Sequence, residues 1–221
     1  MKSKIQLMKT RDGSHTLFSP DLDEHYHSMN GAIAESMHVF INAGFLHASL
    51  TGIKLLEIGF GTGLNALLTC QAAKRNKMKT EYHSIDNSQL PDDIIQQLNY
   101  PDLIAGSHEI FERIHNADWN KTVTIDNHFI LKKINYDLPS YELLDTYDVV
   151  YFDAFGPDKQ PEMWTNQVLA KIYQHMNPNG IFTTYAAKGE MRRRLRDIGF
   201  ITETLPGPPG KREMTRAFKK E

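Results

Sequence analysis

Cysteine is almost missing from the 221-residue sequence, since Cys70 is the only one. A lone cysteine excludes an intrachain disulfide, and its place on the apolar side of an expected helix indicates a core position. The sequence has no apolar run near the roughly 20 residues that cross a bilayer. Met1 to Arg11 is basic and polar, without the apolar core of a signal peptide. These absences predict a cytoplasmic protein with no membrane partner.

Metal-ligand clusters are scarce as well. His25 and His27 lie close together, but neither a cysteine nor a second acidic cluster stands at ligand spacing. We therefore expect no metal site. The share of hydrophobic residues, 40%, and of charged residues, 24%, is ordinary for a globular protein. The length suits one α/β domain with an appendage.

The charge is unevenly distributed although the net value is only −2. From Lys188 to the end, ten Lys and Arg residues stand against five Asp and Glu, whereas residues 1–187 have fifteen against twenty-two. A basic segment of this kind steers a polyanion, or it is the solvated face of a helix. Composition leaves both readings open for Arg192, Arg193, Arg194 and Arg196.

A glycine-rich loop between an apolar strand and an apolar helix organises the chain. Glycines at 59, 61 and 63 permit a tight turn and the close approach of a ligand to the main chain. A dinucleotide site requires Gly-x-Gly-x-x-Gly, but that spacing places Leu64 where the third glycine belongs. Glu57, at the end of the strand, suits a cationic ligand better than a diphosphate. The alternative is a glycine-rich turn without a ligand.

The remaining pattern predicts a mostly parallel sheet with helices between its strands. The expected strands are Ile53–Ile58, Thr80–Ile85, a strand that follows a hairpin turn at Ile125–Ile130 and ends near Asn135, Tyr147–Phe152, Gly180–Tyr185, Phe200–Leu205 and Glu213–Phe218. The expected helices are Glu24–Phe45, Leu64–Ala73, Pro161–Met176 and Lys188–Ile198, with weak helical pattern in residues 88–121, and turns are expected at Asp12–Ser14 and Asn177–Gly180. Residues 1–45 are interpreted as an N-terminal appendage packed on a core of residues 46–221.

Acidic residues follow four of the expected strands: Glu57, Asp86, Asp137 and Asp153. Carboxyl ends of parallel strands meet at one edge of the sheet, where open α/β sheets bind ligands. An acid after the second strand is placed to accept hydrogen bonds from ribose hydroxyls, in an adenosine cofactor as well as in NAD. The four acids and the glycine loop together predict a binding site at this edge.

Three short sequence motifs carry a specific resemblance to a protein family. The Glu57–Asn65 segment resembles motif I of class I S-adenosylmethionine methyltransferases. Together with Asp153–Pro157 followed by Pro161–Trp164, and with Gly210–Met214, it resembles the MnmC/MnmD family of bacterial tRNA methyltransferases. The segment from Tyr26 to Phe40 is also similar, and residues 88–128 are the least distinctive. The resemblance implies a Rossmann-like α/β fold with a closing antiparallel strand. It also implies methylation of 5-aminomethyl-(2-thio)uridine at the wobble position, in the anticodon loop of tRNA.

The resemblance also implies roles for single residues. Asp153 faces the methyl group and orients the substrate amine, with proton acceptance second, while capping of the next helix is its structural alternative. Tyr26 and Phe155 belong to the substrate side, where Phe155 stacks on the wobble base. Lys211 and Arg212 contact tRNA phosphate or close the site. The cofactor is held by Glu57, Gly59, Phe60, Gly61, Gly63 and Asn65 at its methionine end, by Asp86 at the ribose and by Asp137 at the adenine amino group.

Two other functions remain open at this stage. A methyltransferase or aminopropyltransferase acting on a small amine shares the cofactor fold and the acids. A catalytically silent module keeps the fold to hold tRNA or a protein partner. Bifunctional members of the family that this sequence resembles carry an additional FAD-dependent oxidase domain. We expect no FAD in this chain.

Overall fold

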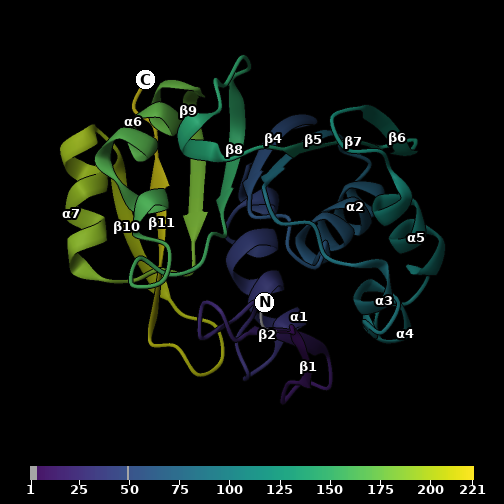
Figure 1. Cartoon of the computed structure of the whole chain (residues 1–221). Coiled ribbons are helices and arrows are strands. Elements are labelled where there is room, and N and C mark those ends of the chain that lie inside the picture. The colour runs from purple at the N-terminus through teal and green to yellow at the C-terminus, as the bar shows by residue number, and fades with distance from the viewer. Residues whose placement is uncertain (1–3, 49) are drawn as a thin grey trace.

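The computed structural model describes residues 4–48 and 50–221, and its centre is an eight-stranded sheet in the order β10-β11-β9-β8-β4-β5-β7-β6 (Figure 1). The five strands from β9 to β7 in this order are parallel to one another, whereas β6 pairs antiparallel with β7, β11 with β9 and β10 with β11. This arrangement confirms the predicted mostly parallel α/β sheet with its closing antiparallel strand. The strands of the sheet are β4 (Gly52–Ile58), β5 (Lys79–Asp86), β6 (Thr122–Asp126), β7 (Phe129–Asn135), β8 (Tyr147–Phe152), β9 (Met176–Thr184), β10 (Ile201–Pro206) and β11 (Glu213–Phe218).

Helices cover both faces of the sheet, which explains the apolar runs of its central strands. On one face, α2 packs with α1, α5 and the π-helix η1 around Leu55, Tyr82 and Tyr151. On the other face, α6 and α7 pack around Val150, Phe152 and Phe182. Cys70 is buried on α2, as expected for a core residue. The helices are α1 (Ala32–Ser36), η1 (Met37–Asn42), the 3₁₀-helix η2 (Phe45–His47), α2 (Leu64–Asn76), α3 (Asp92–Ile95), α4 (Tyr100–Leu103), α5 (His108–Asn116), the 3₁₀-helices η3 (Leu138–Ser140) and η4 (Pro161–Trp164), α6 (Asn166–Gln174) and α7 (Gly189–Ile198).

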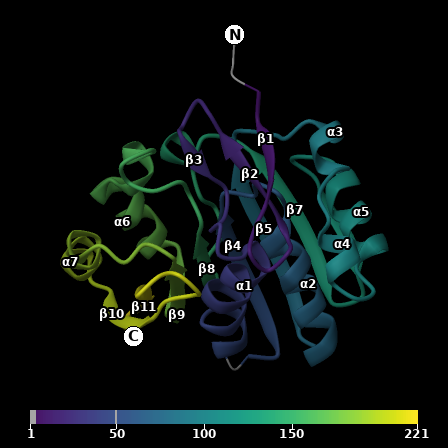
Figure 2. The same ribbon diagram turned by 90° about the horizontal axis from the view of Figure 1, so that it is seen from below.

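A small three-stranded antiparallel sheet stands before the first helix. It contains β1 (Gln6–Lys9), β2 (His15–Ser19) and β3 (Glu24–His25). It lies below the carboxyl ends of the central strands in Figure 1 and in front of the central sheet in Figure 2, which is seen from below. The turn expected at Asp12–Ser14 joins β1 to β2. The division into an appendage of residues 1–45 and a core of residues 46–221 stays a prediction, and residues 1–3 lie outside the described residues.

Three predicted elements were wrong in their bounds. The helix expected from Glu24 begins only at Ala32, because residues 24–25 pair with β2 as strand β3. The turn expected at Asn177–Gly180 lies inside β9, where Asn179 takes a positive φ of 61° and the pairing with β8 shifts register. The helix expected from Pro161 is split by Thr165, whose hydroxyl accepts a hydrogen bond from the Val168 amide and caps α6.

Candidate active site

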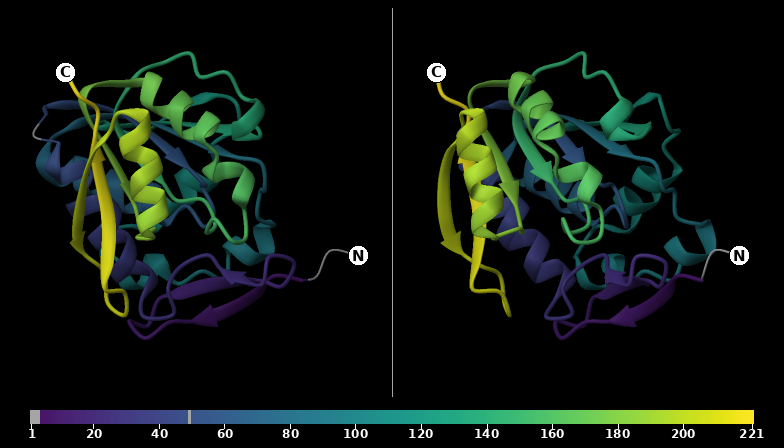
Figure 3. Two further views of the ribbon diagram at one scale, coloured as in Figure 1. Left: turned by 90° about the vertical axis from the view of Figure 1, so that its left-hand side faces the viewer. Right: turned by 60° about the vertical axis from the view of Figure 1, so that its left-hand side comes forward.

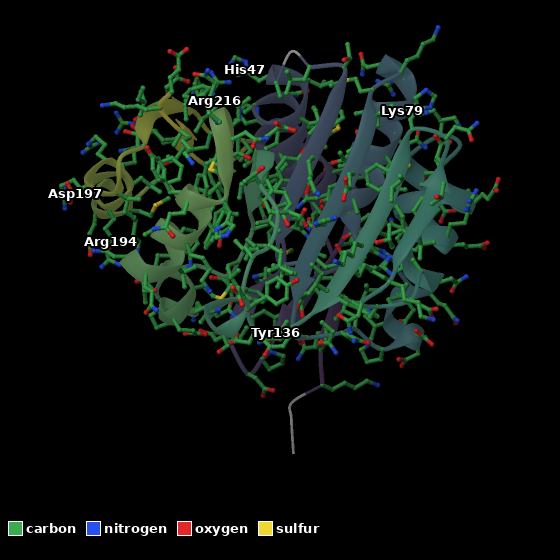
Figure 4. All side chains as sticks on the ribbon, turned by 90° about the horizontal axis from the view of Figure 1, so that it is seen from above. His47, Lys79, Tyr136, Arg194, Asp197 and Arg216 are labelled. Carbon is green, nitrogen blue, oxygen red and sulfur yellow. The ribbon has the colours of Figure 1, made fainter. Side chains whose placement is uncertain are left out.

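A cavity of about 870 Å³ lies at the carboxyl ends of the parallel strands. The loops that follow β4, β5, β7 and β8 line one side, and the segment from Ser19 to Glu35 lines the other. Figure 4 shows the strands running from Lys79, at the start of β5, towards Tyr136, just after β7, which lines the cavity. The predicted site residues Phe60, Gly61, Asn65, Asp86, Asp137 and Asp153 line it with Gly59, Tyr26, Phe155 and Lys211. Of the sequence-predicted set, Glu57, Gly63 and Arg212 are not among the described residues that line it.

The glycine loop brings the ends of β4 and β8 together. Gly59 has a φ of +92°, and a Cβ on it would lie 2.7 Å from the Asp153 carbonyl oxygen. Its amide donates a hydrogen bond to the Ile85 carbonyl at 2.9 Å. Gly61, at φ +51°, faces the ring of Tyr26, which would be 3.3 Å from an added Cβ. Only glycine combines these backbone angles with so close an approach.

Gly63 serves a different contact from the other two glycines. It has a φ of +72° and stands directly before α2, and an added Cβ would lie 2.9 Å from His115 Nε2 on α5. The Phe60 ring also packs edge-on against the rings of His115 and Trp119, with centroid separations of 5.7 and 5.6 Å. Gly63 therefore allows the loop to dock on α5, behind the cavity.

A buried lysine packs against two of these aromatic rings. Lys133 is 2% exposed, and its Nζ donates a hydrogen bond of 2.8 Å to the His115 carbonyl. The same Nζ lies 5.3 Å from the Phe60 ring centroid and 5.1 Å from that of Trp119. Burial lowers the pKa of Lys133 to about 8. No sequence pattern indicated this contact, because its partners lie in two segments far from Lys133 along the chain, at Phe60 and at residues 115–119.

Asp86 and Asp137 form an acceptor pair on one side of the cavity. Asp86 accepts hydrogen bonds from the Gly61 amide at 2.9 Å and from the Ser88 amide at 2.7 Å, one on each carboxylate oxygen. Burial raises its pKa, and the backbone hydrogen bonds lower it. Asp137 accepts from the Asn87 side chain at 3.2 Å. Carboxylate oxygens keep a further lone pair each, so both residues remain able to accept hydrogen bonds from a ligand.

Glu57 lies underneath the glycine loop. It is fully buried, and its Oε2 accepts a hydrogen bond of 2.6 Å from the Ser84 hydroxyl. Burial raises its pKa to about 8, against the hydrogen bond with Ser84, which lowers it. Its charge acts on the Asp153 carboxyl at the cavity, whose pKa it raises.

Asp153 faces the cavity directly after β8. Its Oδ2 accepts a hydrogen bond of 2.8 Å from Asn65 Nδ2, and its own amide donates to the Ile58 carbonyl at 2.9 Å. Burial of the Asp153 carboxyl raises its pKa well above the usual value. The charges of Glu35 and Glu57 raise this pKa further. A carboxylate with a raised pKa is a competent proton acceptor from an amine.

Aromatic side chains form the wall beside Asp153. The rings of Tyr26 and Phe155 pack edge to face at 5.1 Å. Trp164 is 1% exposed, and its indole donates a hydrogen bond of 2.7 Å to the Phe155 carbonyl, so it supports this wall from the core. Tyr185 lines the same cavity and donates its hydroxyl to the Ala154 carbonyl at 2.8 Å. A flat group is well accommodated between such rings.

Lys211 and Arg212, the two basic residues predicted at the site, differ in their surroundings. Lys211 lines the cavity, and its Nζ lies 2.7 Å from Glu35 Oε1. Arg212 is exposed. Parts of the basic helix α7 serve the fold, because Arg192 pairs with Glu213 and Arg194 pairs with Glu190. Arg194 lies at the outer side of the molecule in Figure 4.

The residues present fit S-adenosyl-L-methionine. Glycine main chain lines the cavity and permits a ligand to approach closely, and the acceptor pair Asp86 and Asp137 has the chemistry to accept hydrogen bonds from hydroxyl and amino groups. The carboxylates around the cavity favour a ligand with a sulfonium and an ammonium over one with phosphates. Within the part of the chain that the structure describes, no cluster of metal-binding side chains is present, and no helix has the length and hydrophobicity for a membrane span.

Residues 99–220 match the model of a family described as S-adenosyl-L-methionine-dependent methyltransferases, and this match covers more than half of the chain. The chain belongs to this family. As a methyltransferase, it uses S-adenosyl-L-methionine as its cofactor. The family and the fold expected from the sequence are thereby confirmed.

The methyltransferase is similar to the tRNA 5-methylaminomethyl-2-thiouridine biosynthesis bifunctional protein MnmC of Cupriavidus metallidurans, at 31% identity over 91% of this chain and 32% of the relative. It spans about a third of the length of the first such relatives. An uncharacterized protein of Methanocaldococcus jannaschii is 26% identical over 99% of this chain and 61% of its own length. Among solved structures, MnmC2 of Aquifex aeolicus superposes with a TM-score of 0.80 at 27% identity, over 97% of this chain and 70% of that one.

Proposed function

We propose that the methyltransferase acts on tRNA and converts 5-aminomethyl-(2-thio)uridine at the wobble position to its 5-methylaminomethyl form. The observation that carries the proposal is Asp153, which Asn65 holds at the cavity beside the Tyr26 and Phe155 rings. The names of its bifunctional relatives concern this modification. The anticodon loop is the proposed binding partner, and the cytoplasm is the proposed location.

The proposed cofactor contacts follow the loops at the carboxyl ends of the strands. Asp86 accepts hydrogen bonds from the ribose hydroxyls, and Asp137 accepts one from the adenine amino group. Gly59, Phe60, Gly61 and Asn65 hold the methionine end, and Gly63 contributes by docking the loop on α5. Glu57 acts from beneath the loop through its charge and its support of the backbone.

The reaction requires a neutral amine aimed at an electrophilic carbon. When bound, the cofactor supplies a methyl group on a positively charged sulfur. Asp153 accepts a hydrogen bond from the substrate ammonium and takes one proton from it, which leaves the neutral amine with a free lone pair. The Tyr26 and Phe155 rings hold the flipped base so that this nitrogen stays in line, and such positioning is worth about 7–11 kcal/mol of the barrier.

Incubation with labelled S-adenosyl-L-methionine and tRNA from cells that lack the activity tests this proposal. We expect ribonuclease-sensitive label in the tRNA, which complete nuclease digestion followed by phosphatase releases as the 5-methylaminomethyl nucleoside. Label in small amines alone would favour the methyltransferase or aminopropyltransferase alternative. Cofactor-dependent tRNA binding without transfer would favour the silent binding module.

A further inference from the structure

A lysine side chain occupies a cation site beside Asp153. The ammonium of Lys211 lies 2.7 Å from Glu35 Oε1 and 4.2 Å from the centroid of the Tyr185 ring. Glu35 comes from α1 and Lys211 from the loop between β10 and β11, so two distant segments meet here. Figure 3 shows that loop extending to the N-terminal segment, which lies below the sheet.

Glu35 is built to hold a positive charge. Its side chain is only 7% exposed, and its Oε2 accepts a hydrogen bond of 2.7 Å from the Ser28 amide. A buried carboxylate is costly without a cation, and an aromatic face attracts an ammonium in particular. A second cation at this place would meet the same carboxylate and the same ring.

The site opens onto the reacting end of the cavity. Glu35, Tyr185, Lys211 and Asp153 all line it. The charge of Glu35 raises the pKa of the Asp153 carboxyl, and the charge of Lys211 lowers it. His27 also lines the cavity, is 8% exposed, and has an Nδ1 without a hydrogen-bond partner among the described residues. This buried nitrogen is a further polar group for an incoming ligand.

Lys211 is held less firmly than its partner. Its side chain is 33% exposed, and the long alkyl stem permits it to swing outward. At Gly210 the loop lies directly against the Asn30 side chain, with which an added Cβ would collide. A change in the position of the ammonium therefore requires movement of one side chain, with the loop staying in place.

We propose that the Glu35 carboxylate and the Tyr185 ring form the binding site for the primary ammonium group of the substrate, and that Lys211 occupies this site until the substrate displaces it. The inference rests on the proposed function for the identity of the substrate. It gives the cavity a preference for primary ammonium groups on flat rings. Once bound beside Asp153, the substrate ammonium gives its proton to that carboxylate and becomes the neutral amine that reacts.

Binding of n-butylammonium to the full chain tests the site without tRNA or turnover. We expect Lys211→Met to bind n-butylammonium more than about tenfold tighter than the wild type, because the resident cation is gone. Lys220→Met, at an exposed lysine that is not among the residues lining the cavity, is the matched control and should bind like the wild type. Adding Glu35→Gln to Lys211→Met should remove the gain, and 1-butanol, which has no charge, should bind none of the variants. Equal affinity of Lys211→Met and the wild type would overturn the proposal.

A measurement on the wild type covers the case in which Lys211→Met does not fold. In protein labelled with ¹³C at the lysine ε-carbon, the ring current of Tyr185 shifts the Lys211 ε-protons upfield. We expect n-butylammonium chloride to remove this shift, whereas sodium chloride at equal ionic strength leaves it. A shift that stays, or that both salts remove equally, refutes displacement. Displacement without tRNA methylation would instead leave the amine site standing and refute the proposed tRNA function.

Discussion

Asn65 Nδ2 donates a hydrogen bond of 2.8 Å to Asp153 Oδ2. Asn65 is the second residue of α2, and Asp153 directly follows β8, so this contact joins the helix after the glycine loop to the far side of the cavity. It occupies one carboxylate oxygen and leaves the other for the substrate. The orientation of Asp153 is thus set by the same loop that is proposed to hold the cofactor.

Replacing Asp153 should slow methyl transfer strongly and change cofactor affinity little. We expect Asp153→Asn to retain cofactor affinity within about tenfold and to lose at least about 100-fold in the rate of methyl transfer. The amide cannot take the proton of the substrate amine. Calorimetric titration with S-adenosyl-L-methionine and single-turnover kinetics would measure the two effects. Asp197→Asn, on the outer helix α7 (Figure 4), is the control. Turnover that survives in Asp153→Asn would show that the residue is misassigned.

Two glycines with similar backbone angles provide a matched pair. Gly63 and Gly106 have φ values of +72° and +69°, but a Cβ at 63 would meet His115 Nε2 at 2.9 Å whereas one at 106 meets nothing within 4 Å. Gly106→Ala should cost only the backbone strain, about 1 kcal/mol of unfolding free energy. Gly63→Ala should cost clearly more and weaken cofactor binding, because the loop must leave α5. Urea unfolding and cofactor titration would measure this, and equal losses at both positions would contradict the contact with His115.

Local chemistry explains which parts of the site could be predicted from the sequence. Gly59 and Gly61 are recognisable because their neighbours along the chain form the strand and helix that require a turn. Asp86 and Asp153 could be placed because carboxyl ends of parallel strands meet at one edge. All these residues act through elements that are continuous in sequence. Their presence at the cavity therefore followed once the sheet was recognised.

Contacts between distant segments explain what was missed. Glu35 entered the sequence analysis only as part of a similar segment, and its partner Lys211 stands in the last loop. Lys133 is buried by aromatic rings from two other segments. An acid among the apolar residues of the helix expected at Glu24–Phe45 is the one signal that could have pointed to Glu35. The bounds at Glu24 were wrong for a similar reason, since pairing with β2 overrides the helical pattern.

Arg212 and Lys211 should differ in their effect on tRNA binding. Arg212 is exposed, whereas Lys211 is paired with Glu35. If Arg212 contacts one phosphate, Arg212→Met should weaken binding and reduce the slope of log affinity against log salt by about 0.7–0.9. Lys211→Met should change that slope much less. Filter binding at several salt concentrations would measure both. An unchanged slope in Arg212→Met would make that side chain part of the solvated surface.

Lys133 should make stability rise with pH at the alkaline end. Its pKa is about 8 in the folded chain and 10.5 ordinarily, so between these values the unfolded chain binds the extra proton. The unfolding free energy should therefore increase from about pH 8 upward, by at most about 1.4 kcal/mol per pH unit. Lys133→Met should lack this increase. Urea unfolding across this range, with exposed Lys121→Met as control, would measure it, and parallel profiles would exclude the buried charge as its cause.

Glu57 should act on stability in the opposite direction and at lower pH. Its pKa is raised from 4.5 to about 8, so between these values the folded chain binds the proton that the unfolded chain has released. The contribution of Glu57 to the unfolding free energy is fully present below about pH 4.5 and is lost as the pH rises towards 8. Above that value the folded chain holds a buried carboxylate, which is costly.

The Glu57→Gln variant tests this directly, because glutamine keeps the shape and can still accept the hydrogen bond from Ser84. We expect its unfolding free energy, relative to the wild type, to rise between about pH 5 and pH 8 by at most about 1.4 kcal/mol per unit. Glu162→Gln, at an exposed position, should follow the wild type. If Glu57 also acts on the ammonium of the methionine end through its charge, Glu57→Gln should bind S-adenosyl-L-methionine more weakly at pH 9 while being more stable. A variant that is less stable than the wild type at every pH would show that Glu57 is held as a stabilising carboxylate, against the direction of its pKa.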